Sequence, residues 1–424
     1  MERNAIGLEN LKKQLEKHTG SAMEGKQYLF FDHGDDHEEP VVWHDPSINP
    51  YWEQLTTAFQ FQNLTIENAQ YLGIYVKNVE MPKEIVVALV STVCVGRANN
   101  SIHSVHFINT NLCGGGIVLL STLVQSTPEL RYFYLRDNRI DDMNSALCLS
   151  RALKLHPRMR LDMSHCDLGN DLDTLSVILQ LYVEEICLSH NNIDSRGAVK
   201  ISEYLGRNPP LKSLNLHDNS FNDDDAILLS RSLKENTHLR RLNLQWNNFT
   251  PVGAKALFAT LFDDASLNAI SESNHTCALD IFLFSAPFQR LLFQLNGTLD
   301  RKSKILIALD DRESIVKYLA DMPVGLMPYM LAFIQREGGE MQSMNIMYTA
   351  MRWCNMPAFC SFRHCVSFRI PHNPPAGSLR VLHAPARRGE TRRASKTKIN
   401  NRGTDEFVSN PPFSKIYPNY RGND

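Results

Sequence analysis

The side chains with the clearest capacity for chemistry are two histidines that stand between two aspartates. Asp137, His165, His190 and Asp218 follow one another at intervals of 25 to 28 residues. Imidazoles and carboxylates can ligate a metal ion or bind a charged partner, and paired imidazoles beside carboxylates can titrate near neutral pH. Ligand geometry is seldom reached by regularly spaced surface residues, so the spacing favours a pH-responsive polar surface over a metal site.

Other clusters do not predict catalysis or a cofactor. The sequence contains no P-loop, dinucleotide-binding, serine-hydrolase or zinc-protease motif. The acidic and histidine-rich residues 32–39 are typical of a solvated loop. The cysteines within residues 354–365 lack the paired spacing of structural zinc. We therefore expect a non-enzymatic protein with no catalytic residue, no cofactor and no metal ion.

A repeated phrase of apolar residues predicts the elements that position these side chains. Its five copies occupy residues 130–140, 161–168, 183–193, 211–221 and 239–249. Apolar and polar residues alternate within each copy, which indicates a half-buried strand. An Asn or Cys follows the alternation, and an Asn amide at that position can donate to backbone carbonyls of the neighbouring copies. The copies are therefore expected to stack through a ladder of side-chain hydrogen bonds.

The second half of each copy predicts a helix. In residues 193–205, Ala198, Ile201 and Leu205 fall on one face at helical spacing. Residues 223–225 are three consecutive aspartates, which suit the N-terminal turn of a helix. One strand and one helix per copy give a repeating unit that must stack on its neighbours to bury its apolar face.

This pattern, L-x-x-L-x-L-x-x-N/C-x-L with a start about every 28 residues, resembles leucine-rich repeat proteins of the ribonuclease-inhibitor-like subclass. The resemblance covers residues 60–280 and implies an α/β fold, a curved solenoid with parallel strands inside and helices outside. That fold hosts inhibitors, receptors and GTPase activators alike. A further copy that starts at Leu267 and then loses the pattern is expected to cap the stack. With the helical segment after it, this copy is similar to an expanded set of such proteins in unicellular algae, mostly of unassigned role.

Stacked copies would align equivalent positions into columns about 5 Å apart. One column is formed by the residue just before the ladder Asn or Cys of each copy. It contains Asp137, His165, His190 and Asp218. Tyrosine, tryptophan and arginine dominate protein interfaces, whereas a phosphate backbone would need Lys and Arg throughout the face. We therefore expect these residues to bind a protein partner on the concave face: Tyr134, Arg136, Asp137, His165, His190, His217, Asp218, Gln245 and Trp246.

The chain is expected to divide into four regions. Residues 1–58 form a partly disordered N-terminal flank, 59–280 the leucine-rich repeat solenoid, 281–368 a helical C-terminal subdomain, and 369–424 a disordered, basic, Pro-rich tail. The helix expected before Tyr71 is missing from the pattern, which indicates either a truncated first repeat or a different register of the repeats at this end.

Composition narrows the partner class and the compartment. A net charge of −2 argues against nucleic acid and anionic membrane as partners. No apolar stretch approaches the roughly 18 to 20 residues that span a bilayer, and the N-terminus lacks a signal peptide. An odd number of cysteines, nine, indicates reduced thiols and a cytoplasmic location. Nuclear import through the basic residues 387–398, which include a possible kinase site at Ser395, is the alternative.

These observations predict a non-enzymatic scaffold that binds a protein through the concave face of its repeats. Two alternatives stay open. A GTPase activator of the leucine-rich repeat type needs one exposed arginine, for which Arg97 is a candidate. A ubiquitin-ligase substrate adaptor would use residues 321–333, which are faintly similar to the opening of an F-box. The sequence identifies neither the partner nor the oligomeric state.

Overall fold

The computed structural model describes residues 2–23, 28–32, 42–62, 72–95, 102–112, 114–140, 142–282, 286–297, 300–310, 317–318, 327–337 and 346. Contacts divide the chain into one unit from Met1 to Cys365 and another from Val366 to Asp424, and all described residues belong to the first. Arg97, the cysteines at 354–365, the basic tail and most of the acidic run at 32–39 lie outside the described residues. No helix among the described residues is long and apolar enough to cross a membrane.

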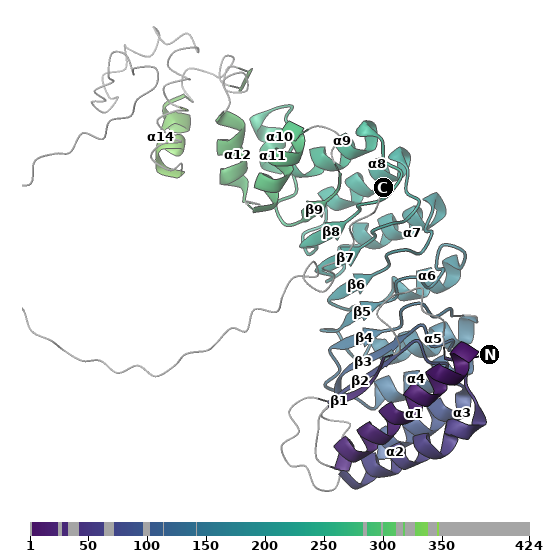
Figure 1. Cartoon of the computed structure of the whole chain (residues 1–424). Coiled ribbons are helices and arrows are strands. Elements are labelled where there is room, and N and C mark those ends of the chain that lie inside the picture. Colours follow the sequence, from purple (N-terminus) through teal and green to yellow (C-terminus); the bar gives the residue numbers. More distant parts are fainter. Residues whose placement is uncertain are drawn as a thin grey trace, which may run out of the picture. The chain divides into compact units, whose positions relative to one another are not determined.

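The described strands form one parallel sheet in which each strand pairs with the next along the chain. They are β1 (Tyr28–Asp32), β2 (Leu72–Lys77), β3 (Ile102–Ile108), β4 (Tyr132–Tyr134), β5 (Arg160–Asp162), β6 (Glu185–Cys187), β7 (Ser213–Asn215), β8 (Arg241–Asn243) and β9 (Ala278–Asp280). The central residue of each short strand points into the core, as Phe133 and Leu214 do with no exposed surface. The strands follow one side of a curve (Figure 1).

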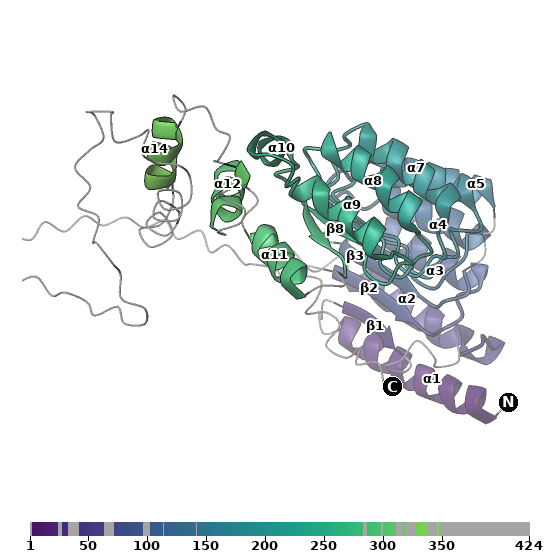
Figure 2. The same ribbon diagram turned by 90° about the horizontal axis from the view of Figure 1, so that it is seen from above.

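Helices cover the other side of this curve, and from α1 to α9 each helix lies beside the next (Figures 1 and 2). They are α1 (Glu2–Met23), α2 (Asn49–Gln62), α3 (Lys83–Val95), α4 (Gly114–Gln125), α5 (Met143–Leu153), α6 (Leu172–Ile178), α7 (Ser195–Gly206), α8 (Asp223–Lys234), α9 (Pro251–Leu261), α10 (Leu267–Glu272), α11 (Ala286–Gly297), α12 (Arg301–Leu309) and α14 (Met327–Glu337), with a short 3-10 helix at Pro46–Ile48. The predicted α/β solenoid, with parallel strands inside and helices outside, is confirmed.

The local sequence explains where these helices begin. Ala198, Ile201 and Leu205 of α7 are fully buried, as their spacing predicts. Asn222 caps α8 in a reciprocal arrangement with Asp225, so the run of aspartates does lie in the first turn of a helix. The cap satisfies backbone N–H groups that have no partner inside the helix.

A ladder of buried asparagines joins the repeats where the strands end. Asn191 donates to Met163 O at 2.8 Å and accepts from the backbone N–H groups of Cys166 at 2.9 Å and Leu168 at 3.2 Å. Asn138 and Asn219 make the same kind of contact with their own neighbours. Cys166 Sγ occupies the same position in its repeat and contacts Leu135 O at 3.0 Å. The predicted ladder is therefore present.

The sheet begins earlier in the chain than the repeat pattern indicates. Strand β1 lies within residues 1–58 and pairs with β2 in parallel. Helix α1 packs beside α2 with Leu11 and Leu15 buried. Helix α2, which begins at Asn49, precedes β2 where the sequence pattern lacked a helix for the first repeat. Helix α2 does not carry the consensus spacing, which is why the repeat pattern did not reveal it.

The C-terminal end of the stack differs from the expected repeat at Leu267. That residue begins helix α10, and the next strand is β9, whose register pairs Leu279 with Leu242. Helix α12 then contributes Lys304, a fully buried side chain whose Nζ donates to Leu261 O at 2.7 Å and to Asn274 O at 2.5 Å. Burial lowers the pKa of Lys304 to about 8. A lysine that caps the end of α9 thus joins α12 to the last repeats.

Candidate functional site

The strands of the central repeats end in a left-handed turn that places one side chain at the edge of the concave face. The residues at this turn have φ between 50° and 58°, and we call them the exit column: Asn109, Asp137, His165, His190, Asp218 and Trp246. Positive φ is uncommon for residues with a Cβ, although Asn and Asp adopt it more readily than most. Because the turn recurs in parallel strands, the six side chains follow one another along a single edge.

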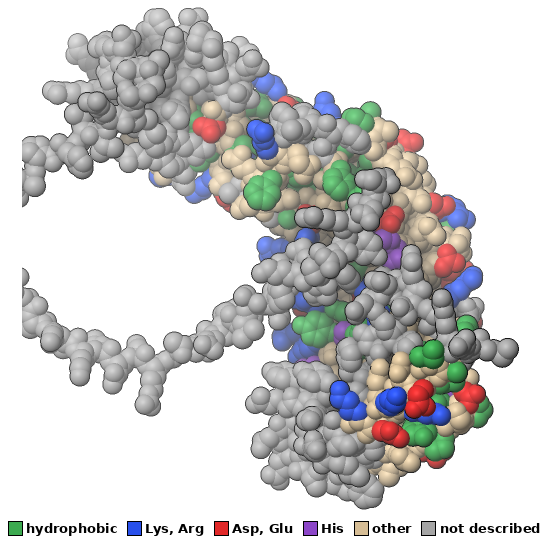
Figure 3. Space-filling model, viewed as in Figure 1, with side chains coloured by type: hydrophobic (Ala, Val, Ile, Leu, Met, Phe, Trp, Pro, Cys, Tyr) green, Lys and Arg blue, Asp and Glu red, His purple; other side chains and the backbone are tan. Residues whose placement is uncertain are grey.

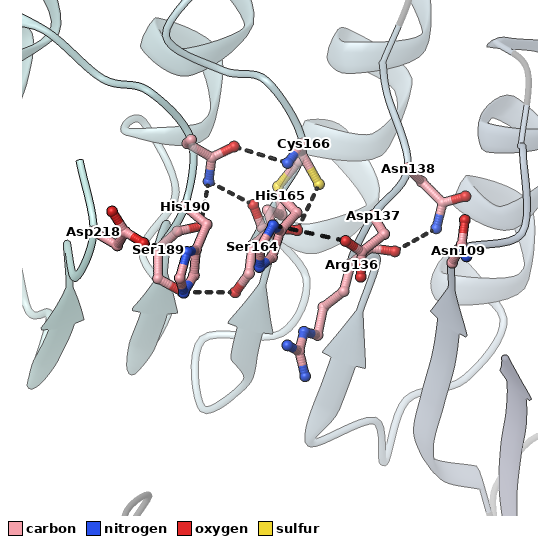
Figure 4. A network of polar contacts seen from close by, with 12 residues as sticks. Asn109, Arg136, Asp137, Asn138, Ser164, His165, Cys166, Ser189, His190 and Asp218 are labelled. Atoms are coloured by element: carbon pink, nitrogen blue, oxygen red, sulfur yellow. Dashed lines mark hydrogen bonds and ion pairs between the residues drawn. The ribbon is translucent and has the colours of Figure 1, made fainter. Parts of the chain in front are cut away.

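The two histidines of the exit column lie face to face. Their ring centroids are 4.2 Å apart with an interplanar angle of 9°. His190 Nδ1 lies 2.8 Å from Asp218 Oδ2, and His165 Nδ1 lies 3.8 Å from Asp137 Oδ1. Figure 4 shows the stacked pair with one aspartate at each end. The structure therefore brings together the four residues from which the sequence argument began.

Burial lowers the pKa of two histidines on this edge, His190 and His217. Burial, and then the neighbouring His165, lowers the pKa of His190, although Asp218 acts in the opposite direction. Burial, followed by His190, lowers the pKa of His217. In both side chains, burial therefore disfavours the protonated imidazole. In the described part of the chain, no three or more His, Cys, Asp or Glu side chains are arranged to hold a metal ion.

Aromatic rings continue from this pair across the later strands. The ring centroid of His217 lies 5.3 Å from that of His190 and 6.5 Å from that of Trp246. Trp246 in turn lies 5.6 Å from Phe282 with the rings at 88°. We call this series the aromatic row: His165, His190, His217, Trp246 and Phe282. Trp246 is 65% exposed and Phe282 is 52% exposed, so the row ends in two large apolar rings that face solvent.

A second aromatic cluster contains Tyr134. Its ring centroid lies 4.2 Å from His106 and 6.5 Å from Tyr132. The Arg160 guanidinium lies over the ring of Tyr132, 5.5 Å from its centroid. Burial, and secondarily Arg136, lowers the pKa of His106 to about 4. Tyr134 is half-buried at the centre of this cluster.

A buried polar network lies on the concave face between the aromatic row and the cluster around Tyr134. Asp162 accepts from the Ser164 hydroxyl, and Ser164 lies 3.2 Å from Cys187 Sγ. Ser189 donates to Ser164 at 3.0 Å (Figure 4), and Asn215 donates to Cys187 at 3.2 Å. Burial raises the pKa of Cys187 to about 11, so the thiol is protonated and is not poised as a nucleophile. This region holds the strands together and does not offer open contact area.

The nine expected partner-binding residues are not equally placed. Six of them lie along the exit column or the aromatic row: Asp137, His165, His190, His217, Asp218 and Trp246. Arg136 has a side chain that is only 12% exposed and lies 3.8 Å from Asp162 Oδ2. Gln245 is half-buried beside Asn243. Both signs of charge are visible where described residues form the surface in Figure 3.

Phe282 is the residue that sequence reasoning missed. The expected repeat start at Leu267 placed the last strand too early, because the connection between α9 and β9 contains the extra helix α10. Asp280 pairs with Asn243 in the sheet, so Phe282 stands two residues later at the position of Gln245 in the preceding repeat. An alignment on Ala278–Asp280, where polar and apolar residues alternate before an aromatic, would have found it.

Comparison with known proteins agrees with the repeat architecture. Residues 182–202, 207–230 and 235–258 match the family described as Leucine Rich repeat. Among solved structures, the crystal structure of an internalin from Listeria monocytogenes is similar at 16% sequence identity, with a TM-score of 0.28. The similarity covers 55% of this chain and 58% of the internalin chain, which is less than two thirds of it. No curated protein matches the chain. The matched stretches and the register of the parallel strands show that this part of the chain folds as leucine-rich repeats.

Proposed function

We propose that this chain is a non-enzymatic scaffold that binds a protein partner on the concave face of its repeats. The observation that carries the proposal is the aromatic row, which crosses five neighbouring strands and ends in two exposed rings. Large exposed aromatics beside polar groups are typical of protein interfaces, and a repeat solenoid presents such residues on one extended surface. Tyr134, Arg136 and Gln245 complete the proposed surface beside the row.

Repeats of about 28 residues with one helix each support a ribonuclease-inhibitor-like subclass. The similarity to the algal set and the cytoplasmic or nuclear location stay predictions. We propose that the protein uses neither nucleic acid nor a membrane as its partner, because its strands carry paired charges of both signs, Arg160 with Glu185 and Arg241 with Asp280.

Affinity capture with the purified full chain tests the proposal. We expect a protein partner, identified by mass spectrometry, to be captured by the wild type and lost from a variant with both Tyr134→Ala and Trp246→Ala. Phe293→Ala is the matched control, because Phe293 on α11 is 83% exposed and lies outside the proposed surface. An unchanged capture profile for the double variant would contradict the proposal. If a small GTPase is captured, a GTP hydrolysis assay distinguishes an activator from a scaffold.

A further inference from the structure

We infer that the partner segment carries an arginine or lysine beside an apolar residue, and that this pair binds at Trp246, Phe282 and Asp218. This inference rests on the proposed function and narrows the chemistry of the partner. It follows from three properties of this end of the concave edge, namely its rings, its charge and its backbone conformation.

The rings offer faces to a cation and an apolar group together. Trp246 and Phe282 meet edge to face at 88°, and more than half of each side chain is exposed, so another side chain can contact both rings. Tryptophan is the strongest aromatic partner for a guanidinium or an ammonium group. The cation–π contacts found between described residues involve Tyr51, Tyr132 and Tyr318, so no described cation occupies either ring.

The strand-to-helix segments of the repeats that precede Trp246 are acidic. In each repeat from β5 to α9, one segment runs from the end of the strand through the first turn of the next helix. These segments contain one guanidinium, Arg196, which pairs with Asp194 at 3.0 Å. They contain eight carboxylates: Asp167, Asp171, Asp173, Asp194, Asp218, Asp223, Asp224 and Asp225. Some of these cap helices, but Asp218 belongs to the exit column and its side chain is 54% exposed. A field of this sign attracts a cationic segment and repels an anionic one.

The backbone at Trp246 indicates that the ring is there for binding. Trp246 has a φ of 58°, where a bulky side chain is strained. In the other repeats the same position holds Asn109, Asp137 and Asp218, or the smaller rings of His165 and His190. Because the ring is mostly exposed, little packing compensates the strain. Strain of this kind is typical of residues that serve a ligand and not the fold.

Selection from a library of random twelve-residue peptides, displayed on phage and applied to the immobilised full chain, tests the inference. We expect enriched peptides to contain Arg or Lys next to an aromatic or aliphatic residue. One enriched peptide, labelled for fluorescence anisotropy, should bind at least tenfold more weakly to Trp246→Asn and to Phe282→Ala. Asp218→Asn should weaken binding about fivefold and reduce its dependence on salt. Tyr182→Ala is the matched control, because Tyr182 is 62% exposed and stands before β6, at the opposite end of the strand.

The outcomes separate this inference from the proposed function. Enriched peptides that are acidic or uncharged, yet depend on Trp246, would overturn the cationic chemistry and leave concave-face binding intact. Peptides that match a segment of this chain would replace the external partner with a second copy. Peptides that bind the Tyr134 and Trp246 double variant as well as the wild type, or a library without enrichment, would count against both.

Discussion

At the scale of single residues, the left-handed turn decides which side chains face a partner. Asn and Asp tolerate this conformation through local hydrogen bonds, whereas a large aromatic ring such as that of Trp246 is a less usual residue there. The exit column therefore mixes residues that suit the fold with residues that the fold has to accommodate. Substitutions in the exit column are therefore expected to change the free energy of unfolding and the affinity for a partner independently.

Trp246→Asn should stabilise the fold while weakening partner binding. A left-handed conformation costs a bulky residue about 1 to 2 kcal/mol, and the substitution relieves this strain. The Trp246 ring is 65% exposed, so the apolar burial lost with it offsets only part of the relief. We expect the free energy of unfolding to rise by up to about 1 kcal/mol. Urea denaturation followed by circular dichroism measures the change. Destabilisation by more than about 1 kcal/mol would mean that the ring packs more than its exposure indicates.

His106 should make the fold sensitive to acid. Its pKa is about 4 in the folded chain, because burial and Arg136 disfavour the imidazolium, and about 6.5 when unfolded. Below pH 6.5 the unfolded chain therefore binds a proton that the folded chain does not, so stability falls as pH decreases from 6.5 to 4. The full loss is about 2 to 4 kcal/mol.

The melting temperature of His106→Phe, measured from pH 7 to pH 4, checks this expectation. Phenylalanine keeps a ring between Tyr75 and Tyr134 and removes the titrating group. We expect the variant to lose less stability on acidification than the wild type. His238→Phe is the control, since it makes the same exchange of side chains at an exposed histidine outside the Tyr75 and Tyr134 cluster. Parallel profiles for wild type and His106→Phe would rule out His106 as the source.

At the scale of elements, the asparagine ladder connects each strand to the next more specifically than apolar packing does. Each buried asparagine satisfies backbone donors and acceptors that would otherwise have no partner where the strands end. The sequence predicted this ladder from the recurrence of Asn138, Asn191, Asn219 and Asn247, because an amide is the side chain that can donate and accept at once.

Asn191→Leu should destabilise the stack strongly although it preserves side-chain volume. Asn191 has no exposed surface and makes four hydrogen bonds, so the substitution leaves buried N–H and C=O groups without partners. We expect a loss of at least about 3 kcal/mol in the free energy of unfolding, measured by denaturant titration. The exposed Asn248→Ala should change it by less than about 0.5 kcal/mol. Similar values for the two variants would exclude an energetic role for the ladder.

At the scale of the whole molecule, the repeats form one continuous core in which each unit is stable only against its neighbours. A disruption in the middle of the stack therefore affects units on both sides. Helices α1 and α2 at one end and α10 and α12 at the other bury residues that a terminal repeat would expose.

Leu214→Asp should unfold the central stack. Leu214 on β7 is fully buried between Ile186 and Leu242, and a carboxylate at that position has no partner. We expect the cooperative thermal transition followed by circular dichroism to be lost or strongly lowered. Val199→Asp, on the exposed face of α7, is the matched control and should melt close to the wild type. A wild-type melting curve for Leu214→Asp would contradict the observed register.

The sequence by itself determined the parallel stack, the asparagine ladder and the alignment of Asp137, His165, His190 and Asp218, because a periodic pattern repeats the same backbone geometry in every unit. Only the tertiary structure decided which aligned side chains are covered. Cys187 and Ser189 are buried by their neighbours, while Trp246 is exposed and meets Phe282. The added strand β1 and the displaced strand β9 also required the structure, since neither follows the consensus spacing. Burial, ring stacking and the shifted pKa values depend on distances between repeats, and a period along the chain does not contain those distances.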